Sequence, residues 1–182
     1  MPHDRHAPRV VVASGMSGTG VSSIASRLQE AAPALNVVDA GARWTDVSEA
    51  CAPGFARVLV VTTHDIVAIT SAYALIKMVR DRFMDAPIEV LVNHSDERDA
   101  LRTYERIQVA ASHFLGETVG YAGAVPSDAG NQEPLMLHES APRGVLGASA
   151  TMALHDLATR LDEELGPTAG RSVWRSGERR LA

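Results

Sequence analysis

The stretch RVVVASGMSGTGVSSIASRLQEAA, residues 9–32, decides the fold of this chain. It begins with a run of β-branched apolar residues that predicts a buried strand. From Ile24 onward the pattern is typical of a helix. The turn between them is rich in glycine and hydroxyl side chains, an arrangement that surrounds phosphate groups in many proteins. The stretch therefore predicts a strand, a glycine-rich turn that is a candidate phosphate site, and a helix, although it contains no lysine.

The rest of the chain repeats the alternation of strand and helix. Short apolar runs bounded by turn residues predict five strands, at Arg9–Ala13, Asn36–Asp39, Arg57–Thr62, Ile88–Asn93 and Val119–Val125. Between most of them the hydrophobic period changes to that of a helix. Strands that alternate with helices of this length pair in parallel and are covered on both faces. The predicted fold class is α/β, a three-layer sandwich around a mainly parallel five-stranded sheet.

Three helices can be predicted in detail. The helix after the third strand should bury one face made of Ile66, Ile69, Tyr73, Ile76, Val79 and Phe83. The next should start at Ser95 or Asp96, which are suitable N-caps, and stop at Gly116. Its apolar face should hold Leu101, Tyr104, Ile107, Ala111 and Phe114. The last helix carries Leu154, Leu157, Leu161 and Leu165 on one face and stops at Gly166 and Pro167.

Length and composition predict one soluble domain. The 182 residues are 46% hydrophobic and 21% charged, with a net charge of −5, so there is no general attraction for nucleic acid. A single cysteine excludes an internal disulfide and fits the cytoplasm. No stretch reaches the roughly 20 apolar residues of a membrane span. We expect an N-terminal arm at 1–8, a folded domain at 9–166 and a flexible basic tail at 167–182.

The turn matches the phosphate-loop pattern G-x-x-x-x-G-K-[ST] at Gly15, Gly20 and Ser22, with Val21 at the lysine position. Its backbone amides and the helix N-terminus can still attract an anion. Ser22 can offer its hydroxyl to a magnesium ion. The remaining candidate ligands in the turn are Gly18, Thr19 and Ser23.

A dinucleotide-binding pattern fits the same turn. It uses Gly18 and Gly20, with Ser23 in place of the third glycine, and Asp39 where an acidic residue would hold a ribose. A tight connection with no ligand is a third interpretation. The turn alone does not separate these three.

Longer segments carry a resemblance to a known family. They are VVTTHDIVAITSAYALIK at 60–77, VLVNHSD at 90–96 and FLGETVGYAGAVPSD at 114–128. With the opening turn, they resemble the MinD/ParA group of P-loop ATPases, and within it the FlhG (FleN) type of flagellar number regulator. The likeness runs from about Arg9 to Leu165. It implies a P-loop NTPase-like sheet with strand order 2-1-3-4-5.

The resemblance also assigns roles to residues. The family loop K-G-G-x-G-K-[ST]-[ST] has lysines at the positions of Met16 and Val21. Asp39 would be the magnesium-side aspartate, together with Ser22, and Arg43 replaces a glycine that meets the γ-phosphate. Asn93 would read the adenine edge, and Asp128 would belong to the loop around the base and ribose.

Several parts of the ATPase machinery are missing by this comparison. Both lysines are absent. The family also has several dozen residues, comprising its switch segment and two strands, that have no counterpart before Asn36. Phosphoryl transfer depends on such groups acting together, so we expect ATP hydrolysis to be lost. ATP or ADP with Mg²⁺ would bind weakly at most. With the outer strands gone, the strand at Asn36–Asp39 should lie at or next to a sheet edge that needs cover from a loop, a helix or a second chain. The nearest candidate is the segment 41–55, with Trp44, Val47 and Phe55 as apolar anchors.

The leading hypothesis is an ATPase-deficient, cytoplasmic regulatory protein that acts by protein contact in flagellar placement or number. The resemblance implies FlhF-type GTPases, flagellar switch proteins or a flagellar transcription regulator as partners, and homodimers in the intact family. The N-terminus lacks the activator motif used on FlhF. The alternatives are an active ATP-dependent dimerisation switch and a small dinucleotide-binding enzyme.

The tail has arginines at 171, 175 and 179 beside Trp174, a pattern compatible with contact to a membrane surface. Gly170 and Gly177 interrupt it, so we expect no regular structure there.

Overall fold

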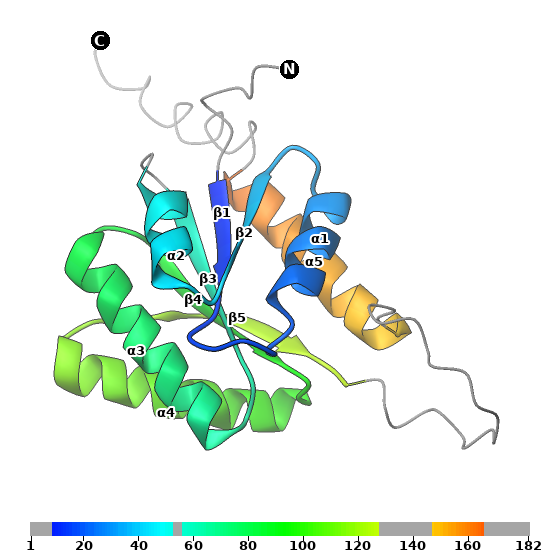
Figure 1. Cartoon of the computed structure of the whole chain (residues 1–182). Helices are drawn as coiled ribbons and strands as arrows, with labels where there is room; N and C mark the ends of the chain where they lie inside the picture. Colours follow the sequence, from blue (N-terminus) through cyan, green and yellow to red (C-terminus); the bar gives the residue numbers. More distant parts are fainter. Residues whose placement is uncertain (1–8, 53–55, 128–146, 166–182) are drawn as a thin grey trace, which may run out of the picture.

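A computed structural model describes residues 9–52, 56–127 and 147–165. The predicted N-terminal arm and basic tail lie outside these residues. Strands and helices alternate along the chain, as Figure 1 shows. The strands are β1 (Arg9–Ala13), β2 (Asn36–Gly41), β3 (Ala56–Thr62), β4 (Ile88–Asn93) and β5 (Gly120–Val125). The helices are α1 (Val21–Ala31), α2 (Trp44–Cys51), α3 (Ile66–Arg82), α4 (Glu97–Leu115) and α5 (Ala148–Leu165).

The five strands form one parallel sheet in the order β2-β1-β3-β4-β5. Val10 of β1 stands opposite Val37 of β2 on one side and opposite Arg57 of β3 on the other. The α/β class and the parallel pairing predicted from the sequence are confirmed, and so is the strand order that the resemblance implied. β2 forms one edge of this sheet, which confirms the edge position expected for the acidic strand.

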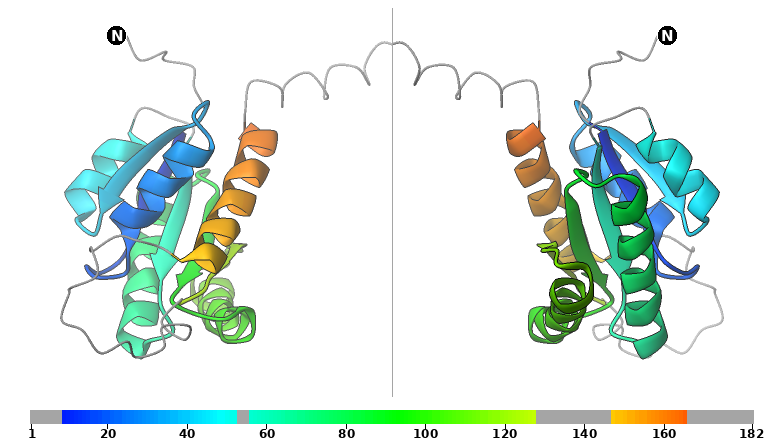
Figure 2. Two further views of the ribbon diagram at one scale, coloured as in Figure 1. Left: turned by 90° about the vertical axis from the view of Figure 1, so that its right-hand side faces the viewer. Right: turned by 90° about the vertical axis from the view of Figure 1, so that its left-hand side faces the viewer.

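Helices cover both faces of the sheet, and alternate residues of β1 show which layer is which. Val11 and Ala13 belong to a core shared with α2, α3 and α4. Val10 and Val12 belong to a second core shared with α1 and α5. The side views in Figure 2 show the sheet between these two layers. Burial on both faces explains why the central strands β1, β3 and β4 are continuous apolar runs rather than alternating ones.

The ends of α4 follow its sequence signals. The Asp96 side chain accepts a hydrogen bond from the Asp99 N–H at 2.9 Å, and Gly116 ends the helix in the left-handed conformation with φ of 68°. Both residues were predicted as caps. In α5, Leu154, Leu157 and Leu161 are buried as expected.

Three expectations about helix faces are wrong. Ile66 is 68% exposed, Leu101 is 40% exposed and Phe114 is 71% exposed, although all three were predicted on buried faces. Ile66 is the first residue of α3, and Phe114 lies in the last turn of α4. Phe114 packs edge-on against Tyr73, with ring centroids 6.4 Å apart, instead of entering the core. Periodicity alone does not show where a helix extends past the sheet.

Helix α2 lies in the segment expected to cover β2, although no helix was predicted there. It buries Val47 and Cys51 in the core that contains α3, and Trp44 packs partly buried against the same core. This helix covers one face beside β2. Phe55, the third expected anchor, lies outside the described residues.

The outer edge of β2 is closed in part by side chains. The Gln29 side chain of α1 accepts a hydrogen bond from the Val37 N–H at 3.0 Å and donates one to the Leu35 carbonyl at 3.0 Å. The Asp39 carboxylate accepts from the Gly41 N–H at 3.0 Å. Main-chain groups that a further strand would need are thus already bonded.

An ionic cluster fastens α5 to the sheet. Glu89 of β4 bonds Arg57 of β3 at 2.6 Å and Arg160 of α5 at 2.7 Å. Glu164 also pairs with both arginines, at 3.1 Å from Arg160. Glu89 and Arg57 are largely buried, with side-chain exposures of 12% and 16%. The cluster lies away from the loop that follows β1.

None of the helices in 9–52, 56–127 and 147–165 combines the length and hydropathy needed to cross a membrane.

Candidate functional site

The glycine-rich turn leaves β1 at the point where the strand order changes direction. β1 pairs with β2 on one side and β3 on the other, and the chain reaches those strands by opposite routes. Ligands of open α/β sheets bind in the crevice at the carboxyl ends of the strands at this switch point. The topology therefore puts the turn where a ligand site is expected.

The turn needs glycine at two positions. Gly18 and Gly20 have φ of 86° and 90°, a left-handed conformation that glycine adopts at little cost. Gly20 is the N-cap of α1, and no side chain caps this helix. The first helical hydrogen bond runs from the Ile24 N–H to the Gly20 carbonyl at 3.1 Å. The amides of Val21, Ser22 and Ser23 come before it and have no partner within the helix.

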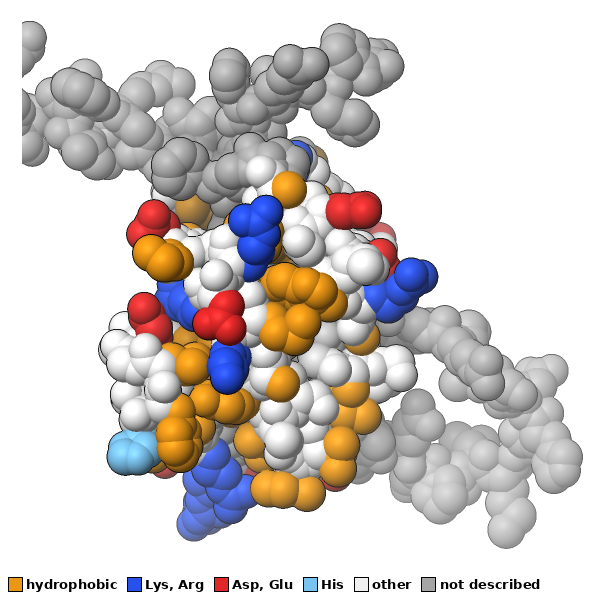
Figure 3. All heavy atoms as spheres, turned by 60° about the vertical axis from the view of Figure 1, so that its left-hand side comes forward, with side chains coloured by type: hydrophobic (Ala, Val, Ile, Leu, Met, Phe, Trp, Pro, Cys, Tyr) orange, Lys and Arg blue, Asp and Glu red, His pale blue; other side chains and the backbone are white. Residues whose placement is uncertain are grey.

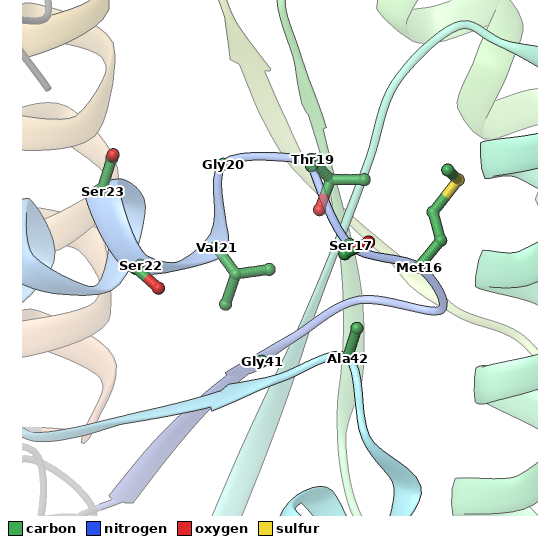
Figure 4. Close-up of a pocket in the computed structure, with 10 residues that line it drawn as sticks. Met16, Ser17, Thr19, Gly20, Val21, Ser22, Ser23, Gly41 and Ala42 are labelled. Atoms are coloured by element: carbon green, nitrogen blue, oxygen red, sulfur yellow. The ribbon is translucent and has the colours of Figure 1, made fainter. Parts of the chain in front are cut away.

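These amides border a cavity of about 250 Å³ (Figure 4). It is lined by Met16, Ser17, Gly18, Thr19, Gly20, Val21, Ser22, Ser23, Gly41 and Ala42. The structure thus brings the predicted loop residues from Gly18 to Ser23 together around one space. No charged side chain is among the described residues that line it. The polar contacts open to a phosphate group there would be amides and hydroxyls, beside the apolar side chains of Met16, Val21 and Ala42.

Val21 occupies the lysine position with its side chain buried. It is only 7% exposed and packs in the same core as Ile24 and Leu28 of α1. In Figure 4 its side chain points into the turn. The residue therefore contributes to the hydrophobic core, and it supplies no charge to the loop.

Gly15 holds the turn against α3. A Cβ atom at this position would lie 2.0 Å from the Ser71 carbonyl oxygen and 2.8 Å from the Ala72 nitrogen. Any other residue would force the main chains apart. Gly15 does not line the cavity and serves as the contact between turn and helix.

Asn93 fastens the other side of the turn. Its side-chain amide donates to the Thr19 carbonyl at 2.8 Å, and its side-chain oxygen accepts from the His94 N–H at 2.9 Å. Asn93 is 3% exposed. His94 adopts a left-handed conformation with φ of 56°, which this bond helps to hold. The sequence predicted neither contact, and adenine recognition by Asn93 stays a prediction.

The predicted metal ligands lie near the cavity but form no compact cluster. Ser22 is exposed in the first turn of α1 and lines the cavity. Asp39 is exposed, and its carboxylate is bonded to the Gly41 N–H. Within the described ranges, no three or more His, Cys, Asp or Glu side chains are grouped to hold a metal ion. A magnesium ion would therefore depend on Ser22, Asp39 and the phosphate that accompanies it.

Two further predicted residues have different outcomes. Arg43 is largely exposed and its nearest ionic partner is Asp46, at 3.7 Å. Asp128 lies outside the described residues.

One property of the site had no signal in the sequence. Thr19 is 2% exposed, and its hydroxyl oxygen has no hydrogen-bond partner among the described residues. A threonine in a glycine-rich turn would ordinarily be taken for a solvated residue, because its burial depends on how the turn folds back.

The fold and the turn define a three-layer α/β protein with a phosphate-loop-like turn that lacks lysine. No protein-family model matches the chain, and no curated protein matches it either.

Proposed function

We propose that this chain is an ATPase-deficient protein of the MinD/ParA type, similar to FlhG, that regulates by protein contact. The observation that carries the proposal is the buried Val21 side chain, at the position where the phosphate-loop pattern has lysine, in a glycine-rich turn that leads into α1. A lysine there stabilises charge on the phosphates during transfer. With valine, the loop keeps its amides and loses the cation.

The electrostatics of the loop support the same proposal. The described lining has no cation, and the closest acidic residue of β2, Asp39, is two residues before Gly41 of the cavity wall. The charge that develops in phosphoryl transfer would find no cationic side chain among the described residues of the lining.

Exposed apolar side chains on two helices support action by contact. Ile66 and Val67 at the start of α3, and Val109 and Phe114 on α4, are each more than 60% exposed. Figure 3, seen from the side of α2 and α3, shows hydrophobic side chains gathered between charged ones. Exposed apolar surface of this kind often marks a contact with another protein. The resemblance to FlhG suggests that the protein acts in the cytoplasm and that the process it regulates is the placement or number of flagella.

Hydrolysis is the direct test. Purified protein with ATP and Mg²⁺ should release phosphate no faster than buffer, while an intact MinD-type ATPase serves as the positive control. Turnover similar to that control would refute the proposal and favour the dimerisation switch. Tight binding of NAD or NADP, measured by calorimetry, would favour the dinucleotide enzyme.

The process needs a separate test in the source organism. Deletion of the gene should change the number or position of flagella, and wild-type protein should restore them. A double variant Ile66→Ser/Val67→Ser should fold normally but fail to restore them. Unchanged flagella in the deletion strain would exclude the flagellar role.

A further inference from the structure

The Thr19 hydroxyl is one of four buried side-chain polar atoms that have no hydrogen-bond partner in the described residues, and Thr19 is the one of these residues that lines the cavity. Its oxygen is shielded from water and has no hydrogen-bond partner among these residues. Buried hydroxyls are nearly always bonded, so each exception calls for a physical cause. Thr19 lies between Gly18 and Gly20 and lines the cavity at the N-terminus of α1.

The direction of the hydroxyl links it to that cavity. Figure 4 shows the oxygen turned to the inside of the loop, the same side as the Val21 side chain. The Thr19 carbonyl points elsewhere and is taken by Asn93 at 2.8 Å. The residue is therefore fixed by its main chain, while its side-chain hydroxyl has no acceptor among the described residues.

We propose that the loop binds a single phosphate group through neutral donors, and that the Thr19 hydroxyl is the donor that determines its specificity. The inference rests on the proposed function, because it assumes that the turn after β1 is a phosphate-binding loop. It adds the class of ligand and a residue for which a phosphate-loop pattern gives no role. The free amides of the first turn of α1 would supply the other hydrogen bonds.

The size and charge of the cavity argue for one phosphate group. Its volume of about 250 Å³ is below the range usual for pockets that enclose a drug-sized ligand. Each further phosphate adds negative charge that no cation in the described lining balances. Affinity should therefore stay level from inorganic phosphate to AMP and ATP, whereas a lysine-containing loop gains affinity along this series.

The test is a calorimetric titration of the full chain with inorganic phosphate, AMP and ATP. Wild-type protein should bind the three ligands with affinities that differ by less than about tenfold, the factor that 1.4 kcal/mol represents. Thr19→Val, which has nearly the same shape without the hydroxyl, should weaken phosphate binding by about tenfold or more, the usual effect of a hydrogen bond to a charged group. Thr19→Ser keeps the hydroxyl and should retain binding.

A stability readout separates this role from a structural one. Without ligand, Thr19→Val should melt at the same temperature as wild type or higher, because it removes a buried hydroxyl that has no partner. Added phosphate should raise the melting temperature of wild type and Thr19→Ser more than that of Thr19→Val.

Three results would overturn the inference. They are equal phosphate binding by Thr19→Val and wild type, no phosphate binding by wild type, and much tighter binding of ATP than of phosphate. If Thr19→Val does not fold, Thr19→Ala replaces it in the same comparison. A wild-type protein that binds no phosphate could still lack ATP turnover and still be needed for normal flagella. This inference can therefore fail while the proposed function holds.

Discussion

The side-chain amide of Asn93 donates to the main-chain carbonyl of Thr19 at 2.8 Å, joining the end of β4 to the turn after β1. The two residues are 74 positions apart in sequence. Both are almost fully buried, so the bond is shielded from water. The turn is therefore held in shape by protein contacts.

Replacement of Asn93 should show how much this bond contributes. Asn93→Ala should lower the free energy of unfolding by about 1–3 kcal/mol, because it leaves the Thr19 carbonyl buried without a donor. Asn93→Asp keeps an acceptor for the His94 N–H but places a carboxylate beside the Thr19 carbonyl. At pH 7 it should therefore lower the free energy of unfolding at least as much as Asn93→Ala does. Urea denaturation measures both. A change below about 0.5 kcal/mol in both variants, typical of surface sites, would show that the bond matters little.

Restoring the lysine should restore binding without turnover. Val21→Lys should tighten ATP binding by about 1–3 kcal/mol, the scale of charge-assisted hydrogen bonds. It should also lower stability, because the ammonium group cannot stay in the core that holds Val21. Val21→Met is the matched control for side-chain length without charge.

Hydrolysis should stay absent even in Met16→Lys/Val21→Lys, because catalytic groups that act as a unit do not return one at a time. Phosphate release by the single lysine variant at a rate normal for MinD-type ATPases would contradict this.

The ionic cluster should be important for stability. Glu89→Ala removes the carboxylate that bonds both Arg57 and Arg160, and leaves Arg57 largely buried. Loss of one partner of a buried ion pair costs about 3–5 kcal/mol. Glu163→Ala, an exposed residue of α5, is the control and should change stability by less than about 0.5 kcal/mol. Similar effects of the two variants in guanidinium denaturation would argue against the cluster.

Glu164 should make the cluster sensitive to acid. Burial alone would raise the pKa of Glu164, but hydrogen bonds and charges from Arg57 and Arg160 outweigh it and lower the pKa. A lowered folded-state pKa adds stability above the unfolded value of about 4.3, and this stability is lost as pH falls further. The difference in unfolding free energy between wild type and Glu164→Gln should therefore shrink between pH 7 and pH 3. A constant difference would show that the carboxylate charge plays no part.

Gln29 should keep the edge of the sheet from pairing with other chains. Gln29→Ala frees the Val37 N–H and the Leu35 carbonyl, and should increase concentration-dependent association in sedimentation experiments. Gln29→Glu keeps the acceptor for Val37 and should behave more like wild type. Amide exchange at Val37 should become faster in the alanine variant alone. Unchanged association and exchange would mean that the edge is protected in another way.

The sheet was predictable from sequence because its central strands β1, β3 and β4 are short apolar runs that are largely buried. Arg9–Ala13 and Ile88–Asn93 have the predicted bounds in the structure. Helix α2 escaped prediction because its eight residues bury only Val47 and Cys51, too few for a clear period. Exposure of Ile66 and Phe114 could not be foreseen, since it depends on where the helices end relative to the sheet.

The site was predictable as a loop, but its contacts were not. Glycine spacing located the residues from Gly15 to Ser23, because a left-handed turn before a helix has a local signature. The bond from Asn93 to Thr19 and the approach of Ser71 to Gly15 join positions far apart in sequence. Such contacts arise only when the strands pair. For the same reason, the burial of the Thr19 hydroxyl has no local signature.

The contact between Gly15 and Ser71 bears on how such a chain can change over generations. The space where a Cβ atom would stand at Gly15 is filled by the main chain of α3, so this position tolerates no larger residue. Val21, by contrast, needs only to fill a place in the core. Over generations, position 15 should therefore stay glycine, whereas position 21 can vary among apolar side chains that fit the same space in the core.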